Sequence, residues 1–249
     1  MAFAVQRQAS IGSLQGSGSA ALQFSSLDGR RGRRFLGDGF HRGAPAASLP
    51  LPNAWCYSRT MQATDVLLHA RPRGIWRAEY ERLVQEGFFD NEKVELIEGI
   101  IVQMSPIGPA HANPVDLLVE SLVPRIAGRA RLRVQQPFAL SDSSEPEPDL
   151  AIVPLGDYSQ SHPSRALLII EVADSSLEHD RETKASLYAA AGVPEYWIVD
   201  VVARVVEVHT QPGAGGYASV QRSETHSVLS IAALPDVTVD VSGLFTANK

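Results

Sequence analysis

Residues 147–200 read EPDLAIVPLGDYSQSHPSRALLIIEVADSSLEHDRETKASLYAAAGVPEYWIVD, and this stretch decides the fold. Three apolar runs in it have the length and the branched residues of buried strands: 149–153, 166–172 and 195–200. Between the second and third runs, the pattern predicts a helix over 180–192, with Asp180 as its N-cap and Gly192 as its end. The stretch therefore predicts three buried strands, with a helix between the second and the third.

Two carboxylates and one amine stand out against this apolar background. Asp149 follows Pro148, which cannot donate a ladder hydrogen bond and marks the start of its strand. Glu171 is the only charged residue in its strand, where a carboxylate is costly unless it is paired or binds a metal. With Lys184, the pair has the chemistry for Mg²⁺- or Mn²⁺-assisted phosphodiester cleavage, in which the amine orients water or offsets negative charge.

Lys184 has two interpretations. Asp180, Lys184 and Tyr188 recur every four residues, so they share one face of the predicted helix. That face can point at the two carboxylates. Alternatively, Lys184 pairs with Asp180 on the surface, an interaction worth only ~0.3–0.5 kcal/mol.

Several separated motifs occur in an order that resembles a known family. They are EYERLV at 79–84, VELIEGIIVQMSP at 94–106, PEPDL at 146–150, LIIEVADSS at 168–176 and HDRETKASLYAAAGVPEYWIVD at 179–200. This order resembles the Uma-type restriction endonucleases of the PD-(D/E)XK nuclease superfamily, from near Trp76 to about Phe245. The resemblance implies an α/β, restriction-endonuclease-like fold, a mixed β-sheet flanked by helices, with Asp149 and Glu171 as metal ligands.

The chain departs from the superfamily motif at one position. The motif places a lysine two residues after the glutamate, where this chain has Ala173. The resemblance implies that the following helix supplies the amine instead, and Lys184 is the residue that matches. The implied function is a metal-dependent endonuclease acting on DNA. Two alternatives stay open: an inactive nuclease-fold binding module, and a hydrolase of a non-polymeric phosphate ester.

The resemblance also points to Glu95 and His111. Glu95 matches an acidic residue that approaches the metal site; alternatively, it is an exposed carboxylate at a strand edge. His111 opens a helix, where a histidine could contact the scissile phosphate or assist proton transfer near neutral pH. The alternative for His111 is a helix-start residue satisfied by backbone groups.

A basic run precedes the first catalytic strand. Arg125, Arg129, Arg131 and Arg133 have no acidic residue among them, and together with Gln135 they are the candidate contacts for a nucleic acid. The charge balance opposes this, because residues 1–60 carry a net charge of +5 and leave −11 for the remainder. DNA is the expected partner, with a homodimer as a further expectation and no membrane, since no window approaches the ~18 apolar residues of a span.

Residues 1–65 differ in composition from residues 66–249, which form the expected nuclease-like domain. The leader is rich in Gly, Ser, Ala and Arg, has no acid before Asp28, and contains the single cysteine, Cys56. This composition is typical of a chloroplast or mitochondrial transit peptide. The alternatives are a disordered tail or a start at Met61, either of which would leave a cytoplasmic protein.

The remaining elements follow from periodicity and turn residues. A hairpin is expected around Glu98 and Gly99, and Pro124 should kink or end the second helix. The expected helices are 76–87 and 110–128; the expected strands are 131–140, 204–210, 217–220 and an edge strand at 237–241.

Overall fold

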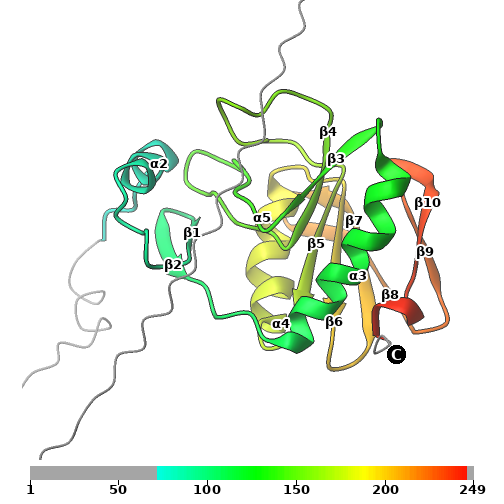
Figure 1. Ribbon diagram of the computed structural model, residues 1–249. Helices are drawn as coiled ribbons and strands as arrows, with labels where there is room; N and C mark the ends of the chain where they lie inside the picture. Colours follow the sequence, from blue (N-terminus) through cyan, green and yellow to red (C-terminus); the bar gives the residue numbers. More distant parts are fainter. Residues whose placement is uncertain (1–71, 246–249) are drawn as a thin grey trace, which may run out of the picture. The chain divides into compact units, whose positions relative to one another are not determined.

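A computed structural model describes residues 72–245 of the chain, and a mixed β-sheet is its central element (Figure 1). Six strands follow the order β3-β4-β5-β6-β7-β8. Their bounds are β3 Ala130–Val134, β4 Leu150–Pro154, β5 Leu168–Ala173, β6 Glu195–Asp200, β7 Val205–Gly213 and β8 Gly216–Ser223. Strands β5 and β6 are parallel and the other neighbours are antiparallel. The predicted mixed sheet flanked by helices is therefore confirmed.

Two hairpins lie outside this sheet. Strands β1 (Val94–Ile97) and β2 (Ile100–Gln103) pair through the predicted turn. Gly99 is required there, because its φ is +80° and an added Cβ would lie 3.1 Å from the Cα of Gly74. Strands β9 (Val228–Ile231) and β10 (Leu234–Asp240) form the second hairpin. The edge strand expected at 237–241 thus pairs with β9, which the sequence patterns did not predict, and not with the main sheet.

Helices cover both faces of the sheet. Their bounds are α2 Arg77–Gln85, α3 Pro109–Ile126, α4 Leu177–His179, a π-helical turn Asp180–Lys184, α5 Ala185–Ala190 and a 3₁₀ turn Ser242–Phe245. Asp180 is not an N-cap, because the helical segment already begins at Leu177 and Asp180 opens the π-helical turn. Pro124 lies inside α3 without ending it. None of these helices within residues 72–245 is long and apolar enough to cross a bilayer.

The predictions for the leader 1–65 lie outside the described residues. The strand expected over 131–140 is shorter than predicted: it ends at Val134, and Gln135 has a φ of +48°. The N–H of Gln135 still donates to Asp149 O at 3.0 Å, and the chain turns away from the ladder at this left-handed residue.

Two hydrophobic cores flank the sheet, with α3 on one face and α5 on the other (Figure 1). Even-numbered residues of β4 and β5, such as Ile152 and Ile170, belong to the core that α3 covers. Odd-numbered residues, such as Ala151 and Ile169, belong to the core that contains Tyr188 of α5. Because successive side chains alternate between faces, this parity directs Glu171 toward α5.

A buried glutamate joins the β1–β2 hairpin to the segment before β4. The backbone N–H of Glu145 donates to Leu96 O at 2.8 Å, and its side chain is buried. Its Oε2 lies 3.8 Å from Arg77 Nη1 and has no hydrogen-bond partner. Burial raises the pKa of Glu145 to about 7, and its interaction with Glu81 adds to the rise.

We expect Glu145 to make stability fall as pH rises. Between the ordinary pKa of 4.5 and about 7, the folded state holds a proton that the unfolded state has released, so the unfolding free energy decreases with pH. Glu145→Gln does not titrate and should be more stable than wild type by roughly 1–3 kcal/mol above pH 7, but little changed at pH 4. Urea unfolding at both pH values measures this. The exposed Glu120→Gln is the control, and an equal effect at both pH values would contradict the prediction.

Candidate active site

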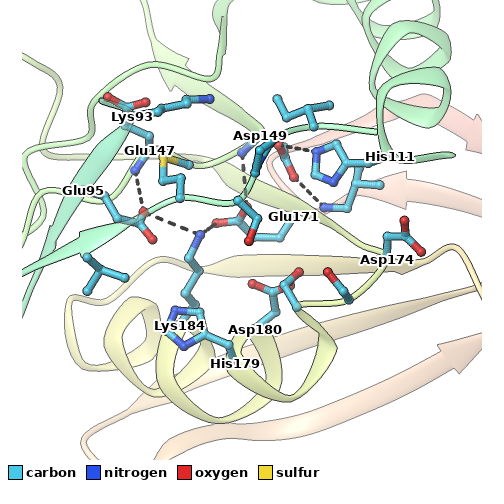
Figure 2. Close-up of a pocket in the computed structure, with 18 of the residues that line it drawn as sticks. Lys93, Glu95, His111, Glu147, Asp149, Glu171, Asp174, His179, Asp180 and Lys184 are labelled. Atoms are coloured by element: carbon cyan, nitrogen blue, oxygen red, sulfur yellow. Dashed lines mark hydrogen bonds and ion pairs between the residues drawn. The ribbon is translucent and has the colours of Figure 1, made fainter. Parts of the chain in front are cut away.

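Strand pairing brings the two predicted carboxylates together. The register Leu150↔Ile170 continues one step to place Asp149 opposite Glu171. The N–H of Asp149 donates to Glu171 Oε2 at 3.2 Å, and the N–H of Val172 donates to Asp149 Oδ2 at 2.8 Å (Figure 2). The carboxylates therefore share one end of the β4–β5 pair, and each accepts a backbone N–H from the opposite segment.

Lys184 reaches this pair from the π-helical turn. Its Nζ donates to Glu171 Oε1 at 3.0 Å and lies 3.7 Å from Glu95 Oε2. The hydroxyl of Tyr188, four residues later, donates to the same Glu171 Oε1 at 2.8 Å. Lys184 is only 6% exposed, so the alternative of a surface pair with Asp180 is wrong.

Glu95 enters the site from β1. Its side chain is buried, which makes the alternative of an exposed strand-edge carboxylate wrong. Its Oε2 accepts the N–H of Glu147 at 3.1 Å in addition to facing Lys184. Glu95 thus fixes the lysine and the chain just before Asp149 at the same time (Figure 2).

His111 approaches Asp149 from the first turn of α3. Its Nε2 lies 2.8 Å from Asp149 Oδ1, so the ring is bonded to a carboxylate and not to backbone groups. Gln135, predicted as a nucleic-acid contact, donates its Nε2 to the same oxygen at 3.2 Å. The left-handed backbone at Gln135 is what turns its side chain to this position beside β4.

The carboxylates differ in their affinity for protons. Burial opposes ionisation of Asp149, yet the hydrogen bond from His111 and the N–H of Val172 outweigh it, so its pKa is lowered. Burial raises the pKa of Glu171 to about 8, against the attraction of the Lys184 ammonium. Burial alone would lower the pKa of Lys184, but Glu171 and Glu95 raise it, and the amine stays charged. The hydrogen bond to Asp149 raises the pKa of His111.

These residues line an open cavity of about 320 Å³. Among the described residues, its wall carries six carboxylates and two lysines: Glu95, Glu147, Asp149, Glu171, Asp174, Asp180, Lys93 and Lys184. Glu147, Asp174 and Lys93 were not predicted. Residues two apart in an extended segment face the same side, so the position of Glu147 two residues before Asp149 could have predicted its place in the wall. The wall has an excess of negative charge, which suits a cation.

The donor set fits a magnesium-like ion. Asp149 Oδ2 and Glu171 Oε2 each accept one backbone N–H, and a carboxylate oxygen has room for a second partner. Within residues 72–245, no three His, Cys, Asp or Glu side chains converge to form a closed metal cage. Mg²⁺ is usually held by one or two carboxylates together with water and substrate phosphates, whereas structural zinc requires a closed set.

The predicted arginines lie away from this cavity. Arg129 pairs with Asp236 at 2.8 Å, and Arg125 donates to the backbone and side chain of Ser121. Arg131 lies 5.5 Å from the ring centroid of Tyr158, and Arg133 Nη2 lies 3.4 Å from His162 Nδ1. Only Arg131 and Arg133 share a strand edge, so the run does not form one continuous basic surface beside the carboxylates.

Comparisons with known proteins identify the fold and the family of the chain. The crystal structure of "a putative nuclease belonging to DUF820" from Anabaena variabilis matches with a TM-score of 0.55 and 16% identity, covering 69% of this chain and 97% of that one. This likeness concerns the fold. Among curated proteins, no significant match is found. The family model described as "Uma2: Putative restriction endonuclease" matches residues 77–242. The chain therefore belongs to the Uma2 family.

Proposed function

We propose that the chain is a Mg²⁺- or Mn²⁺-dependent endonuclease that hydrolyses phosphodiester bonds in DNA. One observation carries the proposal: Asp149 and Glu171 face each other across β4 and β5, and Lys184 bonds the same Glu171 within one cavity. Membership of the Uma2 family supports it. In this proposal Asp149 and Glu171 hold the ion, which when bound supplies positive charge to the scissile phosphate.

Lys184 serves to donate hydrogen bonds and not to accept a proton. Its pKa is raised by Glu171 and Glu95, so an ammonium faces the cavity at neutral pH. Such a group orients the attacking water and offsets negative charge on the phosphate oxygens. Glu95 holds the ammonium from its other side and is a positioning residue.

His111 has a different role. The hydrogen bond to Asp149 raises the pKa of His111, which favours the protonated imidazole, and the same bond fixes the ring. A protonated imidazole at the cavity wall can give its proton to the leaving oxygen as the P–O bond breaks. Gln135, bonded to the same Asp149 oxygen, keeps that carboxylate in place.

One observation favours a second candidate, a hydrolase of a non-polymeric phosphate ester. None of Arg125, Arg129, Arg131 and Arg133 lines the cavity, and the wall is acidic. A long polyanion gains little from such a wall, whereas a small ester needs only the bound ion and Lys184. Supplying plasmid, single-stranded DNA and p-nitrophenyl phosphate esters in parallel distinguishes the two functions.

Asp149→Asn should abolish activity without unfolding the chain. It keeps the size of the side chain but removes the charge that holds the ion. We expect Mg²⁺-dependent cleavage of plasmid and single-stranded DNA to fall by at least ~10²-fold, and Mn²⁺ binding measured by calorimetry to be lost. Asp174→Asn, an exposed carboxylate of the same wall, is the matched control. Equal cleavage by both variants would mean that the ion lies elsewhere.

Lys184→Met should separate ion binding from water orientation. It leaves Glu171 and Glu95 buried without their counter-ion, so stability should fall by roughly 3–5 kcal/mol above pH 8 and partly recover below it, because the pKa of Glu171 is about 8 even with Lys184 present. Below its melting temperature the variant should still bind Mn²⁺ but cleave at least ~10²-fold more slowly. Lys93→Met is the control, because Lys93 lines the same cavity but its charge acts on Glu147. Retained cleavage would exclude Lys184 from the chemistry.

A further inference from the structure

A second cavity, of about 430 Å³, lies beside the candidate active site. Lys93 and Glu147 line both cavities, so the two cavities are adjacent. Its volume is within the range of pockets that bind small molecules, which begins at about 300 Å³. A ligand that spans both cavities would have one part at the carboxylates and a neighbouring part here.

Part of the wall of this second cavity is aromatic. Tyr80, Phe89 and Tyr158 line it, and the rings of Tyr80 and Phe89 lie 5.9 Å apart between centroids. The hydroxyl of Tyr80 donates to Val94 O and that of Tyr158 to Pro154 O, which holds both rings in place. Fixed aromatic faces suit a flat ring, because stacking requires no specific hydrogen bond.

The polar groups in this cavity are mainly acceptors. Glu81, Glu145 and Glu147 line it, and Glu145 is 3% exposed with an Oε2 that has no hydrogen-bond partner. A buried acceptor left without a donor is costly, so a ligand that donates a hydrogen bond there is favoured. Arg77 already places its guanidinium 3.8 Å from this oxygen, so a second cation is not needed for charge balance.

Arg77 and Lys93 line the cavity among its carboxylates, and further positive charge lies at its rim. Tyr158 and His162 line the cavity, and each contacts an arginine of the β3 edge: Arg131 lies over the Tyr158 ring, and Arg133 approaches His162. A phosphate is repelled by the acidic interior but attracted by this rim. The arrangement suits the base of a nucleotide inside and its backbone outside.

We propose that this second cavity is a subsite for one unstacked base next to the scissile phosphate, and that it prefers a base whose pairing edge carries an amino group. The proposal rests on the proposed nuclease function. Guanine, adenine and cytosine offer an exocyclic amino group to Glu145, whereas the one donor of thymine, its N3–H, is flanked by two carbonyl oxygens that the carboxylates of the wall repel. The subsite implies that the chain acts on single-stranded or locally opened DNA, because a base inside a duplex cannot reach such a pocket.

Fluorescence anisotropy with the full-length chain in EDTA tests the subsite without cleavage. The probes are a labelled oligo(dT) 12-mer and three versions whose central base is dG, dA or dC. We expect at least one amino-bearing base to bind about tenfold more tightly than oligo(dT), the usual scale of base discrimination by paired hydrogen bonds. Glu145→Gln, which is close to isosteric, should reduce this preference to less than threefold.

A matched pair of phenylalanines tests the stacking. Phe89→Ala should weaken binding of every probe by at least about fivefold, the scale of one lost stacking contact. Phe88→Ala removes the neighbouring ring, which is 64% exposed and does not line the cavity, and should leave binding unchanged. Equal affinities for all four probes, or an unchanged preference in Glu145→Gln, would overturn the subsite.

The two proposals fail separately. Metal-dependent cleavage by wild type without any base preference would overturn the subsite and leave the nuclease function standing. Base-selective binding that depends on Glu145, without cleavage in Mg²⁺ or Mn²⁺, would overturn the nuclease function and support the subsite. Absence of binding to every probe would overturn the subsite, and absence of cleavage of any DNA would then overturn the nuclease function as well.

Discussion

The burial of Glu171 is the constraint on which the candidate site depends. A carboxylate at the centre of an apolar strand is unstable unless donors surround it, and this one has three: the ammonium of Lys184, the hydroxyl of Tyr188 and the N–H of Asp149. Each comes from a different element, so satisfying one charge fixes the π-helical turn, α5 and the start of β4 against β5. The same contacts that make the burial tolerable also assemble the cavity.

Negative and positive charges occupy different places around the two cavities. Acidic groups are gathered inside, around Lys184 and Glu145, while Arg131 and Arg133 remain on the β3 edge. This separation makes an acidic domain compatible with the polyanionic substrate that we propose, because the local placement of charge decides binding more than its sum. The positive charge of this edge would attract a nucleic-acid backbone to β3, and the residues of the cavity walls would decide which groups enter.

The residues that sequence patterns predicted well are those governed by strand alternation and helix period. The apolar runs of 149–153 and 166–172 predicted adjacent strands, and the four-residue spacing of Lys184 and Tyr188 predicted their shared face. Patterns did not predict the π-helical turn or the position of Gln135, because both depend on backbone conformations that tertiary contacts select. The wall residues Lys93 and Asp174 come from irregular segments next to strands, whose side chains follow no period.

The amine of Lys184 comes from a helical segment and not from the strand of Glu171. This difference affects how the protein would lose function. A lysine two residues after the glutamate would be held by the sheet itself, but Lys184 is attached to a short segment of α4, a π-helical turn and α5. Partial unfolding of that segment would remove the ammonium while the central strands stay paired. Hydrogen exchange of its amides, rather than global melting, would then report the temperature range in which the site is intact.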